Sequence, residues 1–179
     1  MKKLIWYYII VFLISMVPLI ELRGAIPYAV GINELITKFA QENQETPVLL
    51  NMLAVYVIAI IGNMIPVPFI FFFARRILEW GKDKKVIGKF FTWCLKKGEK
   101  GGQKLQSKAG RGLYVALLLF VGIPLPGTGA WTGTLAASFL DMDFKKSVLA
   151  VVGGVVLASI IVGVLCTLGF GAWFGITGQ

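Results

Sequence analysis

Long stretches without a charged residue constrain this chain more than any other feature of its sequence. They cover residues 4–20, 24–33, 47–74, 112–140 and 147–179. A transmembrane helix needs about 20 predominantly apolar residues, and the third and last stretches reach that length, although Pro66 and Pro68 must kink or break the third. The chain is 57% hydrophobic and 15% charged, whereas soluble domains carry about 25% charged residues. We therefore expect an all-α integral membrane protein.

Positive charge is concentrated in one block, residues 75–111. The block holds twelve of the eighteen lysines and arginines and three of the nine acidic residues, a net of +9, so the rest of the chain is neutral overall. Cytoplasmic loops of membrane proteins carry an excess of lysine and arginine. The block therefore predicts a linker, residues 81–111, that faces the cytoplasm at a bacterial-type cytoplasmic membrane, and it does not predict nucleic-acid binding.

The linker has the pattern of an amphipathic helix. Apolar residues recur at three- and four-residue intervals from Ile87 to Leu95, which is the spacing of one helix face. Such a helix lies on the lipid surface, where anionic headgroups hold its cations. We expect this contact from Lys84, Lys85, Lys89, Lys96 and Lys97.

Prolines and glycines interrupt two of the apolar segments. Pro18 and Pro27 bracket residues 21–24, and the second break covers residues 124–129. The arms beside the second break have about 11 to 14 residues, enough for only half of the hydrocarbon thickness. Both tips should therefore leave the helix inside the membrane, where irregular backbone is tolerated only if it is buried in protein or lines a wet cavity.

Both halves of the chain show the same order, a broken segment followed by a longer crossing. We predict one membrane domain, 1–179, built from two repeats, 4–80 and 112–179. The broken segments either return to the side they enter from, as re-entrant hairpins, or span the membrane. The count of cations on each side does not distinguish the two topologies. The short arms favour re-entrant hairpins that enter from opposite faces, an inverted repeat.

Glu21 and Arg23 are closely flanked by apolar sequence on both sides. Charges at membrane depth usually face a bundle interior or an aqueous cavity and mark functional sites. Glu21 is a candidate for proton uptake, and Arg23 is a candidate for holding an anionic group such as a phosphate. Gly24 and Pro27 complete this tip. The alternatives are a charge at the membrane interface and a structural ion pair.

The second tip carries no charge. A half-helix that begins after Gly127 would direct its free amide donors toward an anion. The alternative is a Pro-Gly kink packed by small residues. We expect this tip to contribute seven residues to the site: Pro124, Pro126, Gly127, Thr128, Gly129, Trp131 and Thr132.

The composition argues against catalysis. The chain has no histidine, which removes Ser-His and Cys-His nucleophile pairs and histidine metal sites. It also has no Gly-rich loop followed by lysine and Ser/Thr of the kind that cradles ATP phosphates. We expect neither enzymatic activity nor a bound metal or cofactor.

The chain resembles the small multi-drug export protein family in two motifs. These are Pro18-Leu-Ile-Glu-Leu-Arg-Gly-Ala-Ile-Pro27 and Ile123-Pro-Leu-Pro-Gly-Thr-Gly-Ala-Trp-Thr-Gly133. That family is similar to the DedA superfamily of membrane proteins. The resemblance implies paired re-entrant hairpins and transport, either proton-coupled export or translocation of undecaprenyl-phosphate-type lipid carriers. Glu21 would correspond to the acidic residue of the first DedA-type hairpin, but the arginines that flank the second hairpin's proline in DedA proteins have no counterpart here.

These observations predict a small secondary transporter with its site where the two tips meet. Its substrate would be a small molecule or a lipid phosphate. A chain of 179 residues leaves little material around a cavity, which favours a homodimer in the membrane. The alternative is a non-transporting scaffold whose basic helix binds anionic lipids or partners.

Overall fold

The computed structural model describes residues 2–81, 111–125 and 127–177. These residues form seven helices, and within these ranges there is no strand. The predicted all-α class is confirmed. The predicted surface helix, with Lys84, Lys85, Lys89, Lys96 and Lys97, lies outside the described residues.

The first half of the chain consists of a helical hairpin and a long, two-part helix. Helices α1 (Lys2–Met16) and α2 (Glu21–Glu42) form the hairpin, and α1 packs against both α2 and α3. Helices α3 (Met52–Met64) and α4 (Pro66–Gly81) follow one another end to end. Proline is favoured at the first position of a helix, where its missing amide would be unbonded anyway. The break predicted at Pro66 and Pro68 therefore interrupts the helical segment only slightly.

The boundaries of the first hairpin differ from the prediction. The chain leaves the helix at residues 17–20 only, and Pro27 lies inside α2. An interior proline removes one amide hydrogen bond, yet α2 continues past Pro27 to Glu42 and is 22 residues long in total. Its apolar residues keep helical spacing beyond Pro27, and Ala29 and Ala40 are buried. Packing of this face outweighs the lost hydrogen bond.

The second half repeats the order of a hairpin followed by a long helix. Helices α6 (Arg111–Gly122) and α7 (Ala130–Phe139) form the hairpin, and α8 (Phe144–Thr177) is the long helix. With 12 and 10 residues, α6 and α7 are about 18 and 15 Å long. The backbones of α6 and α8 lie close together, because a Cβ on Gly154 would be only 2.7 Å from the carbonyl oxygen of Leu118.

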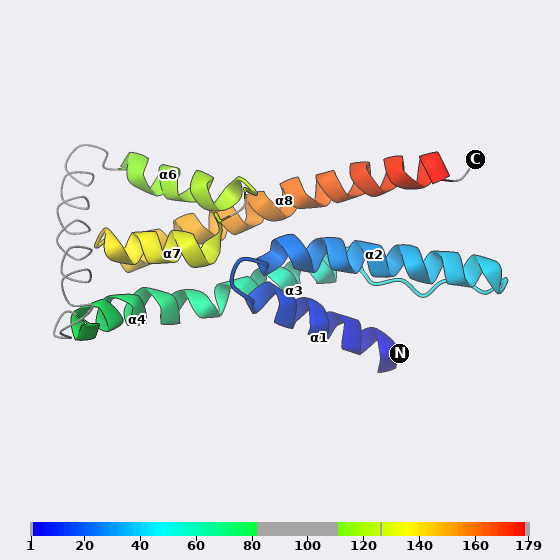
Figure 1. The fold of residues 1–179 in the computed structure, drawn as a ribbon, viewed down its shortest axis with the longest axis horizontal. Coiled ribbons are helices and arrows are strands. Elements are labelled where there is room, and N and C mark those ends of the chain that lie inside the picture. The colour runs from blue at the N-terminus through cyan, green and yellow to red at the C-terminus, as the bar shows by residue number, and fades with distance from the viewer. Residues whose placement is uncertain (1, 82–110, 126, 178–179) are drawn as a thin grey trace.

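The two hairpins point at one another from opposite ends of the molecule (Figure 1). Their tips meet near the middle, while α3–α4 and α8 run past both of them. Both termini lie at one end, together with the α2–α3 connection. The start of α6 and the start of α8, which carries Lys145 and Lys146, lie at the other end.

Much of the apolar surface of the long helices is exposed. The segments Met52–Phe73 and Phe144–Gly169 are long and apolar enough to cross a membrane, and less than half of each is buried. Leu53 is 73% exposed and Leu149 is 72% exposed. Soluble proteins rarely expose contiguous apolar surface on this scale. The distribution is the one expected of a protein whose outer surface faces lipid.

Candidate functional site

The tip of the first hairpin is a turn with unusual backbone angles. Leu19 has φ 69° and Glu21 has φ 53°, in the left-handed region that costs a residue with a side chain about 1–2 kcal/mol. Such angles persist only where the surrounding structure imposes them, and they gather at functional sites. The turn makes Glu21 the first residue of α2, where it is only 3% exposed.

The carboxylate of Glu21 binds the N-terminus of α7 in the other hairpin. Oε2 accepts a hydrogen bond from the amide of Ala130 at 3.1 Å, and Oε1 accepts one from the amide of Trp131 at 3.0 Å. These are the first two residues of α7, and such amides have no partner within their own helix. The anion at this half-helix is therefore a side chain of the same protein.

The guanidinium of Arg23 binds the other side of the same tip. Helix α6 ends at Gly122, and the last carbonyls of a helix lack partners and carry partial negative charge. Arg23 donates hydrogen bonds there through both terminal nitrogens. Its acceptors are the carbonyl oxygens of Val121, Ile123, Leu125 and Thr128 and the hydroxyl of Thr128.

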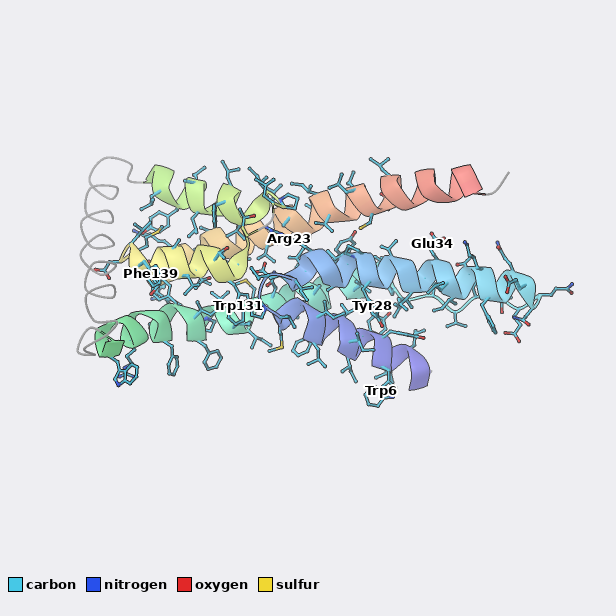
Figure 2. The ribbon with its side chains drawn as sticks, viewed as in Figure 1. Trp6, Arg23, Tyr28, Glu34, Trp131 and Phe139 are labelled. Atoms are coloured by element: carbon cyan, nitrogen blue, oxygen red, sulfur yellow. The ribbon has the colours of Figure 1, made fainter. Side chains whose placement is uncertain are left out.

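We call these contacts of Glu21 and Arg23 with the second tip the tip clamp. The carboxylate faces the positive end of α7 and the guanidinium faces the negative end of α6, so each charge meets a dipole of opposite sign. Arg23 and Trp131 lie where the hairpins meet (Figure 2). Glu21 is buried and both side chains bond to the second tip, so both charges have partners within the protein.

Gly129 allows the two tips to approach this closely. Its φ is +146°, which side-chain-bearing residues rarely adopt. A Cβ at this position would collide with the carboxylate of Glu21, lying 2.8 Å from Cδ. Gly127 also has a positive φ, +81°, but a Cβ there would meet nothing within 4 Å. Gly129 is needed for contact and conformation, whereas Gly127 is needed for conformation alone.

The other predicted residues of the tips lie around the clamp. Gly24 packs against the side chain of Ile20. The Thr132 hydroxyl donates a long, 3.4 Å hydrogen bond to the carbonyl of Gly129. Trp131 contributes its backbone amide to the clamp. Pro126 lies outside the described residues.

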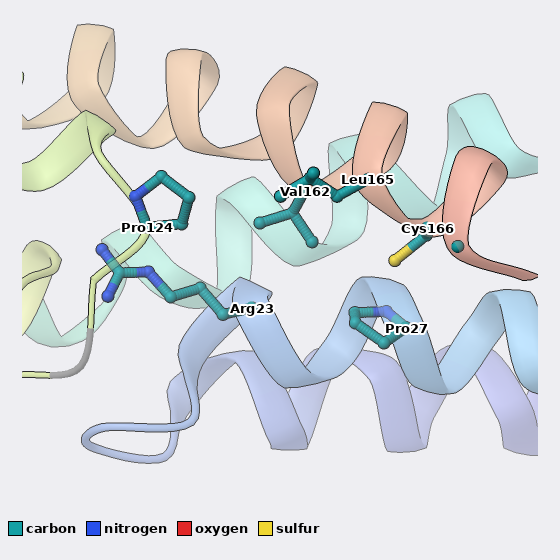
Figure 3. Close-up of a pocket in the computed structure, with 7 residues that line it drawn as sticks. Arg23, Pro27, Pro124, Val162, Leu165 and Cys166 are labelled. Atoms are coloured by element: carbon teal, nitrogen blue, oxygen red, sulfur yellow. The ribbon is translucent and has the colours of Figure 1, made fainter.

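A cavity of about 600 Å³ opens beside the clamp. Arg23 and Pro27 of α2 and Pro124 of the second tip form one side of it, and α8 forms the other (Figure 3). Arg23 therefore reaches both the clamp and the cavity. The residues of α8 that line the cavity are Val162, Leu165, Cys166 and Gly169.

A family comparison covers Glu21, Arg23 and the whole second tip, and it ends just before the α8 residues that line the cavity. The family described as Putative small multi-drug export protein matches residues 21–161. The chain belongs to this family. The family description indicates transport rather than catalysis. No curated protein and no solved structure matches the chain.

In this member of the export family, the α8 wall of the cavity could hardly be predicted from the sequence. Val162, Leu165 and Cys166 share one helix face, but apolar residues at that spacing recur throughout α8. One missed residue did have a signal. Asn63 is an amide in the middle of a charge-free crossing, and it is 1% exposed. In the described part of the chain, no three Cys, Asp or Glu side chains are grouped as a metal site requires.

Proposed function

We propose that this export-family protein is a small secondary transporter with two re-entrant hairpins. Each hairpin begins and ends at the same end of the molecule, and α6 and α7 are too short to cross about 30 Å of hydrocarbon. Short, Pro/Gly-interrupted segments in matching places of two halves are typical of transporter binding sites. The positive-inside rule orients the end with Arg111 and Lys145 toward the cytoplasm, so the first hairpin enters from outside.

The substrate of this transporter would occupy the cavity beside the clamp. A volume of about 600 Å³ lies within the range of about 300–1,000 Å³ for pockets that bind drug-sized ligands. Its walls are mostly apolar, with Arg23 as the charged lining residue. These properties fit a compact amphiphile with a polar or anionic group better than a long-chain lipid phosphate, which the cavity is too small to enclose.

Glu21 would couple proton binding to opening of the tips. The observation that carries this proposal is that one buried carboxylate joins the two hairpins through two amide hydrogen bonds. Protonation removes the negative charge that faces the α7 dipole and converts one acceptor oxygen into a hydroxyl. The clamp then weakens, and the equilibrium shifts toward a state with separated tips. In that state Arg23 becomes available to the substrate.

Flux measurements in liposomes test this function. The purified protein is reconstituted, a pH gradient is imposed, and movement of anilinonaphthalene sulfonate, an anionic amphiphile, is compared with that of ethidium. Glu21→Gln should abolish most of the pH-driven flux of the anionic dye, because glutamine cannot titrate. Glu42→Gln, at the exposed end of the same helix, is the control. Equal flux from Glu21→Gln and wild type contradicts the coupling role.

A polyprenyl phosphate carried in the same vesicles tests the substrate class. We expect no accelerated movement of this lipid across the bilayer. If the lipid moves and neither dye does, the substrate is a lipid carrier and the assignment of the cavity is wrong. Homodimer formation stays a prediction.

A further inference from the structure

Three buried polar groups on helices α3 and α7 have no hydrogen-bond partner among the described residues. They are the amide of Asn63, the hydroxyl of Thr134 and the indole nitrogen of Trp131. Asn63 and Thr134 are each 1% exposed. Buried polar groups in folded proteins are almost always bonded to protein or to ordered water. Such a group therefore indicates a bound ligand or water.

One hydrogen bond sets the register between α7 and α4. The hydroxyl of Ser138 donates to the carbonyl oxygen of Phe71 at 2.7 Å, and the two helices pack together and run in the same direction from the tips (Figure 1). Four residues make about one turn, or 6 Å. By helical spacing, Thr134 should face Val67, one turn back toward the tips from this contact.

By the same helical spacing, a second turn back should bring Ala130 toward Asn63. Helical geometry continues from α4 into α3, because Ile65 between them has φ −58° and ψ −45°. The amide of Ala130 is bonded to Glu21. On this register we expect both Asn63 and Thr134 within about two helical turns of the clamp carboxylate.

These residues form a polar row along one face of α7. Trp131, Thr134 and Ser138 are spaced i, i+3 and i+7, which places them on the same side of a helix. The row begins beside Glu21 and leads toward the end of the molecule where α6 and α8 begin. The buried hydroxyls of Ser15 and Ser159 do not contribute, since they bond to carbonyls of their own helices.

The chemistry of the row favours water over a metal cation. An indole nitrogen only donates, an amide both donates and accepts, and a hydroxyl does both. A bare cation would bond to the oxygens and leave the donors unpaired. A buried water typically makes about three hydrogen bonds and satisfies donors and acceptors together.

We propose that ordered water is held among Asn63, Trp131 and Thr134 and forms the proton route between Glu21 and the cytoplasmic end. The routing rests on the proposed transport function, whereas the water itself does not. Arg23 is the charged neighbour of Glu21 on α2. Residues 47–74 and 112–140, which include α3, the start of α4, most of α6 and all of α7, contain no Asp, Glu, Lys or Arg, so the proton has no alternative carboxylate there.

Two tyrosines and Cys166 on the surrounding helices lie elsewhere. The hydroxyl of Tyr8 in α1 accepts a hydrogen bond from the amide of Asn51, just before α3 begins. Tyr56 of α3 packs against Gly163 of α8, and Cys166 lines the cavity. None of these groups stands in the polar row, so water is the carrier that the row requires.

Radiolytic hydroxyl labelling tests for the water without any transport assay. X-ray pulses convert bound water into hydroxyl radicals, which modify adjacent side chains, and Trp131 is a reactive reporter. We expect modification of Trp131 to fall severalfold in Asn63→Leu and in Thr134→Val. The matched control is Ser147→Ala, which removes another buried hydroxyl without a partner in the described residues. Unchanged labelling in both variants, or an equal fall in the control, overturns the water site.

Proton flux in liposomes tests the route. Thr134→Val should slow pH-driven proton movement severalfold while equilibrium binding of anilinonaphthalene sulfonate stays unchanged, since the valine lies away from the cavity. A fall in labelling with normal proton flux means that the water is present and the route is wrong. If wild type shows no pH-driven flux, the transport function and the route both fail, and the labelling still decides whether the water is present.

Discussion

The two hairpins share a shape but reach it with opposite chemistry. The first tip turns through residues with side chains, Leu19 and Glu21, and carries two charges. The second tip turns through Gly127 and Gly129 and carries none. What the second tip offers instead is bare backbone, the amides that begin α7 and the carbonyls that end α6. Side-chain charge on one tip is thus matched to backbone dipole on the other.

This difference makes each hairpin depend on its counterpart. A buried charge without a partner is costly, and so are helix ends without hydrogen bonds in an apolar surrounding. The clamp satisfies both requirements in one contact. A change that separates the tips must therefore supply new partners for Glu21, for Arg23 and for two helix ends, and water or substrate in an opened cavity would be such partners.

The largest effect should come from removing the cation of the charged tip. Arg23→Ala leaves the carbonyls at the end of α6 unpaired and the charge of Glu21 unbalanced. We expect the free energy of unfolding in detergent micelles to fall by about 3 kcal/mol or more, because several hydrogen bonds to a charged group, each worth about 1.5–3 kcal/mol, are lost. Denaturant titration followed by tryptophan fluorescence measures it.

Two further variants sharpen this result. Arg23→Lys should lose less stability than Arg23→Ala, because an ammonium keeps the positive charge. It should still be less stable than wild type, because an ammonium cannot bond to five acceptors as the planar guanidinium does. Arg76→Ala removes an exposed arginine of α4 and should change stability by less than about 0.5 kcal/mol. If Arg23→Ala is as stable as Arg76→Ala, the clamp does not hold the hairpins together.

A smaller effect should come from adding one methyl group to the uncharged tip. Gly129→Ala forces a Cβ onto the carboxylate of Glu21 and imposes an unfavourable φ, so we expect a loss of about 2–3 kcal/mol. Gly127→Ala imposes the unfavourable φ without a steric clash, so it should lower the free energy of unfolding by about 1 kcal/mol. Thermal unfolding of both variants in the same detergent provides the comparison.

A double-mutant cycle separates contact from backbone strain. In a Glu21→Ala background the carboxylate is absent, so the cost of Gly129→Ala should fall toward that of Gly127→Ala. An unchanged cost of Gly129→Ala in that background would mean that the backbone angle, and not the approach of the tips, explains the glycine.

Charge-free length and Pro/Gly breaks were enough to predict the helices and the two interrupted segments. The predicted limits of the first break were wrong because proline and glycine indicate only the local conformational preference of the backbone, and not how the helix packs. Pro27 has a tolerable place inside α2, and the actual turn uses left-handed angles at Leu19 and Glu21 that no residue type there signals. Pro18 lies within the turn at residues 17–20, so the local sequence indicates where the turn is but not that it ends there.

The sequence also identified Glu21 and Arg23 but not what they contact. Their partners are main-chain amides and carbonyls, which every residue has, so the second tip shows no complementary charge that a pattern could detect. Gly129 was visible as part of a flexible stretch, and only the structure shows that its missing Cβ makes room for a carboxylate. The α8 wall of the cavity is apolar sequence within a helix that is apolar along most of its length.

The smallest effect should come from the one side chain of the second tip that joins the clamp. The hydroxyl of Thr128 accepts from Arg23 at 3.0 Å and donates toward the carbonyls of Ile123 and Leu125, each at 2.9 Å. Thr128→Val keeps the shape and removes these bonds, so we expect a loss of about 1 kcal/mol, read from the shift in denaturant midpoint at constant slope.

Thr132→Val is the matched control for that substitution. It removes only the long hydrogen bond to Gly129 and should cost less than about 0.5 kcal/mol. If the two valine variants lose the same stability, the Thr128 hydroxyl adds nothing to the clamp. The second tip then binds Arg23 through main-chain carbonyls alone. In that case the first tip contributes only charged side chains to the clamp and the second tip contributes only backbone.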